Sequence, residues 1–221
     1  IDLTNQNGDD AAGMTVTRSG SSTVVTSTTN TGNALVLSGF LGNFTSSNIT
    51  FNTADGSILA TNFDGAAASL DGGTGNDQLI AGSNGDTLDS GTGGTDKLIG
   101  GDGDDVFQFT AAGFADDTAT GGSGTDTIEL STDATIADAD FTNATSTETL
   151  SVTNIDFNNT ITLAAEADTA GIRTVDASAQ TGTNNIADLT IGAGFTADLT
   201  FTGGEGPVSY THLTLPTSFL V

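Results

Sequence analysis

The sequence predicts an all-β fold in which short parallel strands coil as a solenoid, flanked by further short-strand segments. Glycine and aspartate return about every nine residues from Gly72 to Phe109, which is the period of a turn followed by a very short strand. An apolar residue follows each repeated aspartate by two positions, so each strand can bury one side chain. The chain of 221 residues contains 30 glycines, a composition typical of proteins built from turns and short strands.

The nine-residue pattern occurs four times in tandem and once more after a gap. In register the copies read GGTGNDQLI (72–80), AGSNGDTLD (81–89), SGTGGTDKLI (90–99), GGDGDDVFQ (100–108) and GGSGTDTIE (121–129). They follow the nonapeptide GGxGxDxUx, in which U is a large apolar residue. The U positions, which we expect to stack as the core, are Leu79, Leu88, Leu98, Phe107 and Ile128.

These repeats resemble those of the RTX, or haemolysin-type calcium-binding, family. The resemblance implies a right-handed parallel β-roll in which two nonapeptides make one coil and Ca²⁺ lies between stacked turns. It pairs Asp77 with Asp96 and Asp86 with Asp105. The ligands that it implies are the repeat aspartates and carbonyl groups around four turn glycines: Asp77, Asp86, Asp96, Asp105, Asp126, Gly73, Gly75, Gly101 and Gly103.

The chemistry of these residues agrees with calcium. Ca²⁺ is a hard cation that takes about 6–8 oxygen ligands, and glycine turns leave their carbonyl groups uncovered. Two copies depart from the pattern, because Ala81 and Asn84 replace glycines and one extra residue lies near Gly93 and Gly94. We expect the extra residue to disturb the Asp77/Asp96 pair. The alternative is a metal-free roll whose aspartates only form turns.

The gap before the fifth copy sets a condition on Asp126. It can be a ligand only if another turn stacks on its own turn. We therefore expect Asp105→Ala to weaken calcium binding more than Asp126→Ala, because Asp105 has a predicted partner.

The charge of the chain restricts its partners. There are 28 acidic against 3 basic residues, a formal net charge of -25. Such an excess repels itself in a compact state and disfavours nucleic acid, so bound divalent cations are the expected partners. No apolar stretch reaches the roughly 18 residues that a membrane-spanning helix needs, and we expect no membrane insertion.

The regions around the repeats also predict short strands. We divide the chain into an N-terminal β segment (1–69), the repeats (70–130), a C-terminal solenoid-like segment (131–207) and a tail (208–221). The C-terminal segment resembles linker repeats of bacterial adhesin and surface-layer proteins. Threonine ladders of the kind seen in ice-binding solenoids are not evident in it, because its threonines follow no fixed Thr-x-Thr register. A helical turn is expected near 137–144. The expected strands are 23–26, 34–37, 49–51, 57–60, 148–152, 160–163, 172–175, 189–191 and 199–201.

The two ends of the sequence do not read as natural ends. There is no initiator Met or signal peptide, so residue 1 is expected to lie inside a longer chain. The tail 208–221 resembles the translation of a sequencing adapter, as in a metagenomic fragment read into its adapter, and we set it aside. The alternative is a genuine C-terminal strand or secretion tail. Setting the tail aside also removes the single histidine, His212, and the single tyrosine, Tyr210.

The remaining residues contain no histidine and no cysteine, so we expect no catalytic activity from them. The expected function is that of a calcium-binding structural module of a secreted or cell-surface bacterial protein, whose folding is coupled to Ca²⁺. Its expected partners are calcium ions and cell-surface or matrix polysaccharide or other surface proteins. The alternative is the C-terminal calcium roll of a secreted protease, lipase or polysaccharide-modifying enzyme, which the sequence upstream of Ile1 would distinguish. A third, weaker option is a β-helix polysaccharide lyase.

Overall fold

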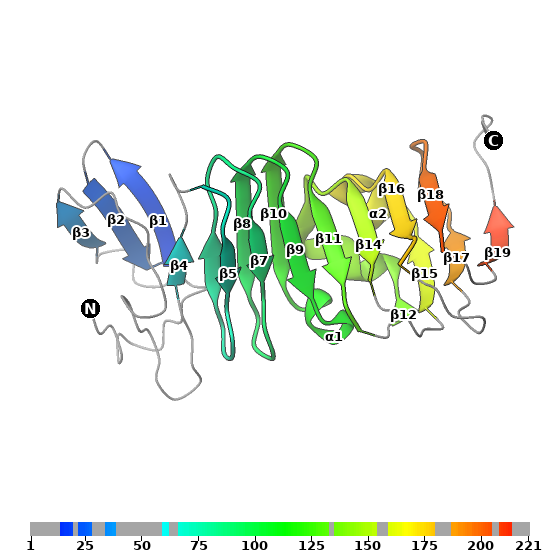
Figure 1. Cartoon of the computed structure of the whole chain (residues 1–221), viewed down its shortest axis with the longest axis horizontal. Helices are drawn as coiled ribbons and strands as arrows, with labels where there is room; N and C mark the ends of the chain where they lie inside the picture. The colour runs from blue at the N-terminus through cyan, green and yellow to red at the C-terminus, as the bar shows by residue number, and fades with distance from the viewer. Residues whose placement is uncertain are drawn as a thin grey trace.

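The structure, a computed structural model, describes residues 14–19, 22–27, 34–38, 59–61, 66–132, 135–153, 159–179, 187–204 and 208–213. Within them the molecule is an elongated stack of coils whose strands run across the long axis (Figure 1). The fold class predicted from the sequence is confirmed, since the described strands form mainly parallel sheets in an all-β roll.

The N-terminal strands form an antiparallel sheet of order β1-β2-β3, which lies at one end of the stack (Figure 1). Two of its strands confirm the expected strands at 23–26 and 34–37. The expected strand 49–51 lies outside the described residues. The bounds are β1 Met14–Ser19, β2 Ser22–Ser27 and β3 Ala34–Ser38.

Two parallel sheets face each other across the roll, and each coil as far as β13 and β14 contributes one strand to each of them. In chain order, the described five-stranded sheet contains β4 Leu59–Thr61, β6 Gln78–Ile80, β8 Lys97–Asp102, β10 Thr118–Ser123 and β13 Ala144–Thr145. The described seven-stranded sheet contains β5 Ser69–Asp71, β7 Thr87–Asp89, β9 Val106–Phe109, β11 Thr127–Leu130, β14 Thr149–Val152, β16 Thr174–Ala177 and β18 Thr200–Gly203.

The core is the predicted stack of apolar side chains. Leu79 is in register with Leu98 in one sheet, and Leu88 is in register with Phe107 in the other. These four side chains and Ile128 are fully buried. Short strands therefore fold here because each adds one apolar side chain to a continuous column, as in other solenoids.

Beyond the repeats the coils lengthen and a third parallel sheet appears. Hydrogen-bonded residues in adjacent coils are 18 and 19 residues apart at first, then 21 and 22, and finally 26 and 28. This sheet contains β12 Thr135–Ile136, β15 Asn159–Leu163, β17 Ala187–Ile191 and β19 Val208–Leu213. The five-stranded sheet ends at β13, and helical elements occupy that side of the later coils. They are the 3-10 helix η1 Asp138–Asn143, which confirms the helical turn expected near 137–144, and α2 Ala165–Ala170.

The boundary expected at residue 130 does not interrupt the sheets. The fifth repeat is part of the stack, because β10 pairs with β8 and β11 pairs with β9. The gap before it contains the short helix α1, Ala111–Phe114. β11 then pairs with β14, so the seven-stranded sheet continues into the C-terminal segment. There the strands β14, β16 and β18 overlap the expected strands at 148–152, 172–175 and 199–201, respectively.

The structure aligns threonines of different coils that the sequence does not show in register. One file on the outer face of the seven-stranded sheet is mostly threonine, although no regular sequence period announces it. The unequal coil lengths hide this register from a search for a fixed spacing. In order along the sheet the file is Ser69, Thr87, Val106, Thr127, Thr149, Thr174 and Thr200.

The C-terminal strand β19 pairs in parallel with β17, with Val208 opposite Ala187. The assignment of 208–221 to an adapter stays a prediction. Among the described residues, no helix combines the length and apolar character that membrane crossing requires.

Candidate metal centre

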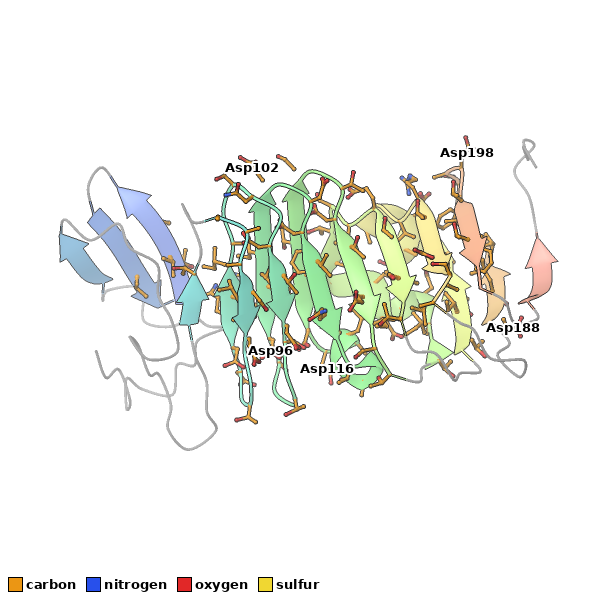
Figure 2. The ribbon with its side chains drawn as sticks, in the orientation of Figure 1. Asp96, Asp102, Asp116, Asp188 and Asp198 are labelled. Carbon is orange, nitrogen blue, oxygen red and sulfur yellow. The ribbon has the colours of Figure 1, made fainter. Side chains whose placement is uncertain are left out.

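The repeat turns stack in two rows, one on each edge of the roll. The first edge holds the turns that precede strands of the five-stranded sheet, at 72–77, 90–96 and 110–117. The second edge holds the turns that precede strands of the seven-stranded sheet, at 81–86, 100–105, 121–126 and 146–148. In Figure 2, Asp96 lies at the first edge and Asp102 at the opposite, second edge.

On the second edge, an acidic side chain of each coil binds the backbone of the coil before it. Asp105 Oδ1 accepts a hydrogen bond from the Asp86 amide at 2.7 Å, and Asp126 Oδ1 accepts one from the Asp105 amide at 2.8 Å. The ladder begins with the Ala68 amide, which donates to Asp86 Oδ1 at 2.7 Å. It ends with Glu148 Oε2, which accepts from the Asp126 amide at 2.8 Å.

The first edge repeats this arrangement. Asp96 Oδ1 accepts from the Asp77 amide at 2.8 Å, and Asp117 Oδ1 accepts from the Asp96 amide at 2.7 Å. The turns predicted to stack, Asp77 on Asp96 and Asp86 on Asp105, are therefore adjacent in the structure. Whether these aspartates bind a metal stays a prediction.

The extra residue in the third repeat does not break the first ladder. Gly93 and Gly94 absorb it because both adopt positive φ, 77° and 96°, a conformation that costs glycine little. A bridge between Thr74 and Thr92 and a hydrogen bond from the Thr95 amide to Asn76 Oδ1 at 2.8 Å keep the two turns in register. The expected disturbance of the Asp77/Asp96 pair is absent.

Asp126 has stacked neighbours on both sides, in the turns of Asp105 and Glu148. The condition that the sequence set on this residue is met. The reason for expecting a smaller effect from Asp126→Ala than from Asp105→Ala is therefore wrong, and we now expect comparable effects.

The second carboxylate oxygens point into the stack. Oδ2 of Asp105 and Oδ2 of Asp126 are buried and find no hydrogen-bond partner within the described part of the chain. Oδ2 of Asp77 and Oδ2 of Asp86 are buried as well. A buried carboxylate oxygen without a partner is costly, and in such a position a bound cation or a proton offsets the charge.

Burial and like charge raise the pKa values of these groups. Loss of hydration, reinforced by Asp117 and Asp77, raises the pKa of Asp96 to about 7. Loss of hydration, reinforced by Asp126, Asp86 and Asp104, raises the pKa of Asp105 to about 6. The pKa of Asp126 is also raised, first by burial and then by Glu148 and Asp104.

At the first glycine of three repeats, the position that a Cβ atom would take lies close to a carboxylate oxygen and to a carbonyl oxygen, and we call this position the gap. A Cβ atom at Gly72 would lie 2.7 Å from Asp77 Oδ2 and 2.8 Å from the carbonyl oxygen of Ser90 in the next coil. A Cβ atom at Gly100 would contact Asp105 Oδ2 and lie 2.7 Å from the carbonyl oxygen of Gly121. Each gap thus joins a carboxylate to a carbonyl of the following turn, the donor chemistry that Ca²⁺ prefers.

The carbonyl groups predicted as ligands also face the next coil. Cβ atoms at Gly94, Gly122 and Gly124 would contact the carbonyl oxygens of Gly75, Gly101 and Gly103, respectively. The Gly73 carbonyl accepts a hydrogen bond from the Thr92 amide at 2.7 Å, so it takes part in the contact between turns. Further carbonyl oxygens that could act as metal ligands, and that the sequence did not indicate, are those of Ser90, Gly121 and Ser146.

Sequence reasoning also missed two members of the ladders, Asp117 and Glu148. Neither belongs to a glycine-rich turn. Each is nevertheless an acidic residue two positions before a buried apolar residue, Ala119 and Leu150, respectively. That short pattern is the sequence feature that could have found them.

Side chains alone do not form a metal cage in the described residues. No group of three or more histidine, cysteine, aspartate or glutamate residues is placed to hold an ion there. A cation at these turns would therefore take much of its coordination from backbone carbonyls, which fits calcium better than metals that require nitrogen or sulfur ligands.

Comparison with known proteins adds no relative. No protein-family model, curated protein or solved structure matches this chain.

Proposed function

We propose that this chain is a calcium-binding structural module of a secreted or cell-surface protein, and that its folding is coupled to calcium binding. The observation that carries the proposal is the pairing of a buried carboxylate oxygen with a carbonyl of the next turn. At Asp105, for example, Oδ2 has no hydrogen-bond partner in the described residues and borders the gap at Gly100, opposite the Gly121 carbonyl. The resemblance of the repeats to RTX nonapeptides supports the same function.

The electrostatics of the molecule support calcium as the missing partner. Aspartates one coil apart converge on each edge, in a chain whose formal net charge is -25. Their mutual repulsion opposes stacking unless a cation lies between the turns. Because each site needs ligands from two coils, binding an ion also brings those coils together, which couples binding to folding.

The proposed location follows from the expected affinity. Sites with few carboxylates and many carbonyls, as in extracellular modules, bind calcium with Kd values of about 10⁻⁴–10⁻³ M. Calcium reaches such concentrations outside cells, where the module would be folded. The proposed role is structural, because the seven-stranded sheet extends as one regular surface from β5 to β18.

Equilibrium dialysis with radioactive calcium tests the proposal. We expect the unaltered chain to bind several ions at about millimolar calcium. Asp105→Asn should bind at least one ion fewer, or bind it at least about tenfold more weakly, because one carboxylate charge is lost. Asp116→Asn is the matched control, since Asp116 is exposed and lies outside both ladders.

Two results would count against the proposal. One is an unaltered chain that binds no calcium at about 5 mM, above the Kd range of extracellular sites. The other is an equal loss of calcium from the Asp105 and Asp116 variants, which would point to general screening of charge.

A further inference from the structure

The last rung of the second edge contains no nonapeptide, yet it reproduces the features of one. We propose that Ser146, Thr147 and Glu148 form, with Asp126, a divalent-cation site of their own that closes this row of turns. The site presupposes the calcium-binding function proposed above, but it lies beyond the repeats that suggested that function.

The turn 146–148 places oxygen atoms at the same positions as a repeat turn does. The Ser146 carbonyl oxygen would contact a Cβ atom at Gly121, as the Gly121 carbonyl oxygen would approach a Cβ at Gly100. Glu148 Oε2 accepts the Asp126 amide at 2.8 Å, as Asp126 Oδ1 accepts the Asp105 amide at 2.8 Å. Three residues therefore provide here the oxygen atoms that a turn of six residues provides in a repeat. The glutamate side chain has one more methylene group than aspartate, which lets it reach the Asp126 amide.

Two buried polar atoms belong to this rung and lack hydrogen-bond partners among the described residues. One is Asp126 Oδ2, which borders the gap at Gly121 together with the Ser146 carbonyl oxygen. The other is Thr147 Oγ1, on the residue between Ser146 and Glu148. Both residues are fully buried. Oxygen atoms of a carboxylate, a hydroxyl and a carbonyl, with a second carboxylate beside them, are the ligand types of a hard divalent cation.

The backbone at this turn has a conformation that is rare for serine. Ser146 has φ of 53° and is the single non-glycine residue with positive φ in the described part of the chain. Residues other than glycine rarely adopt this conformation, and where they do it is often at a binding site. Here it accompanies the placement of the Ser146 carbonyl against the gap at Gly121.

The row ends at this site for a chemical reason. Arg173 holds the position directly before β16 that Glu148 holds before β14, and its amide donates to the Glu148 carbonyl. A base thus stands where the preceding coils carry an acid. The guanidinium of Arg173 instead pairs with Asp168 at 3.0 Å. The rung formed by Asp126 and Glu148 is therefore the last in this row with two carboxylates.

The site is tested by calorimetric titration of calcium into the full chain, which compares the unaltered protein with Glu148→Gln. Glutamine keeps a side-chain oxygen that can accept the Asp126 amide, but it loses the charge. We expect this variant to bind one Ca²⁺ fewer than the unaltered chain, or to bind one ion at least about tenfold more weakly. Glu129→Gln is the control, because Glu129 lies on the outer face of β11, where Gln108 Nε2 donates to its Oε1 at 2.9 Å.

Thermal unfolding in chelator separates a metal ligand from a purely structural residue. Without calcium, Glu148→Gln should be at least as stable as the unaltered chain, because repulsion between Glu148 and Asp126 is removed. With calcium it should be less stable. An unaltered calcium count and affinity in Glu148→Gln, or a loss of stability equal in both buffers, would overturn the site while leaving the proposed function in place. An unaltered chain that binds no calcium would overturn both.

Discussion

Each repeat aspartate has two oxygens with different environments. In Asp105, Oδ1 accepts the amide of Asp86 at 2.7 Å, while Oδ2 lies buried beside the gap at Gly100. The hydrogen bond of Oδ1 joins the coils, whereas Oδ2 has no hydrogen-bond partner among the described residues. Under the proposed function, the same side chain therefore supports the fold and makes it depend on a cation.

Substitutions at two neighbouring glycines distinguish an effect on calcium binding from an effect of backbone strain on stability. Gly72→Ala would place a Cβ 2.7 Å from Asp77 Oδ2, so we expect it to weaken calcium binding. Gly73 has φ of 85°, but a Cβ there would meet no described atom within 4 Å. Gly73→Ala should therefore cost about 1–2 kcal/mol of stability and leave the calcium count unchanged. Calcium titration and urea unfolding of both variants measure the two effects, and a reversed pattern would contradict the gap as the binding position.

The raised pKa values predict an unusual pH dependence of the calcium-free protein. Burial, reinforced by Asp117 and Asp77, raises the pKa of Asp96 to about 7. Burial, reinforced by Asp126, Asp86 and Asp104, raises the pKa of Asp105 to about 6. Between the unfolded value of about 3.8 and these values the folded state binds more protons, so its stability falls as pH rises. In chelator, the urea midpoint should be lower at pH 8 than at pH 5. Calcium should remove this decline, since it replaces the protons, and a flat profile in chelator would argue against buried, uncompensated aspartates.

At the scale of the element, each short strand depends on one inward side chain. Phe107 is fully buried and stacks between Leu88 and Ile128. Phe107→Ala should therefore lower the free energy of unfolding by about 3–5 kcal/mol, measured in urea with calcium present. Val106→Ala, on the half-exposed face of the same strand, is the control and should cost far less.

In the later coils the aspartate ladder ends, and an acidic residue, Asp138, caps the start of the helix α2. Asp138 accepts hydrogen bonds from the amides of Ala164 at 2.6 Å, Ala167 at 3.0 Å and Glu166 at 3.1 Å, at the start of α2. Asp138→Ala should cost about 0.5–2 kcal/mol of stability, the range found for lost helix caps, whether or not calcium is present. A loss that appears only with calcium would mean that Asp138 acts through a metal instead.

The sequence was sufficient to predict the parts of the fold that repeat with a fixed period. Tandem copies gave the inward residues Leu79, Leu88, Leu98 and Phe107 and the stacking of Asp86 on Asp105. It was insufficient where coil length changes, because a coil of 21 or 22 residues breaks the nine-residue register without breaking the sheet. Asp117 and Glu148 escaped notice for that reason.

The backbone oxygens of the candidate site could not be predicted from the sequence for a second reason. The oxygens that line the gaps include backbone carbonyls, such as those of Ser90 and Ser146, which no side-chain pattern reports. Their positions follow from how one coil sits on the next. Only the three-dimensional stack shows that the carbonyl of Ser146 occupies the place that a glycine carbonyl occupies in the repeats.

At the scale of the whole molecule, we propose that the roll is one stack whose acidic edges require calcium. The net charge of -25 causes electrostatic repulsion throughout the folded chain. The repulsion is strongest at the turns, where carboxylates are buried. Binding at one rung aligns the coil that forms the next rung, so we expect cooperative folding on calcium addition, with one transition for the repeat region.

The dependence of folding on calcium can be measured by far-UV circular dichroism of the full chain, recorded in chelator and then with calcium at about 5 mM. We expect the β signal in chelator to be weaker, and to be lost at a lower temperature, than the signal with calcium, and further chelator should reverse the gain. Magnesium at the same concentration should have little effect because it prefers smaller octahedral sites. A full β signal that chelation leaves unchanged would contradict the claim that folding is coupled to calcium.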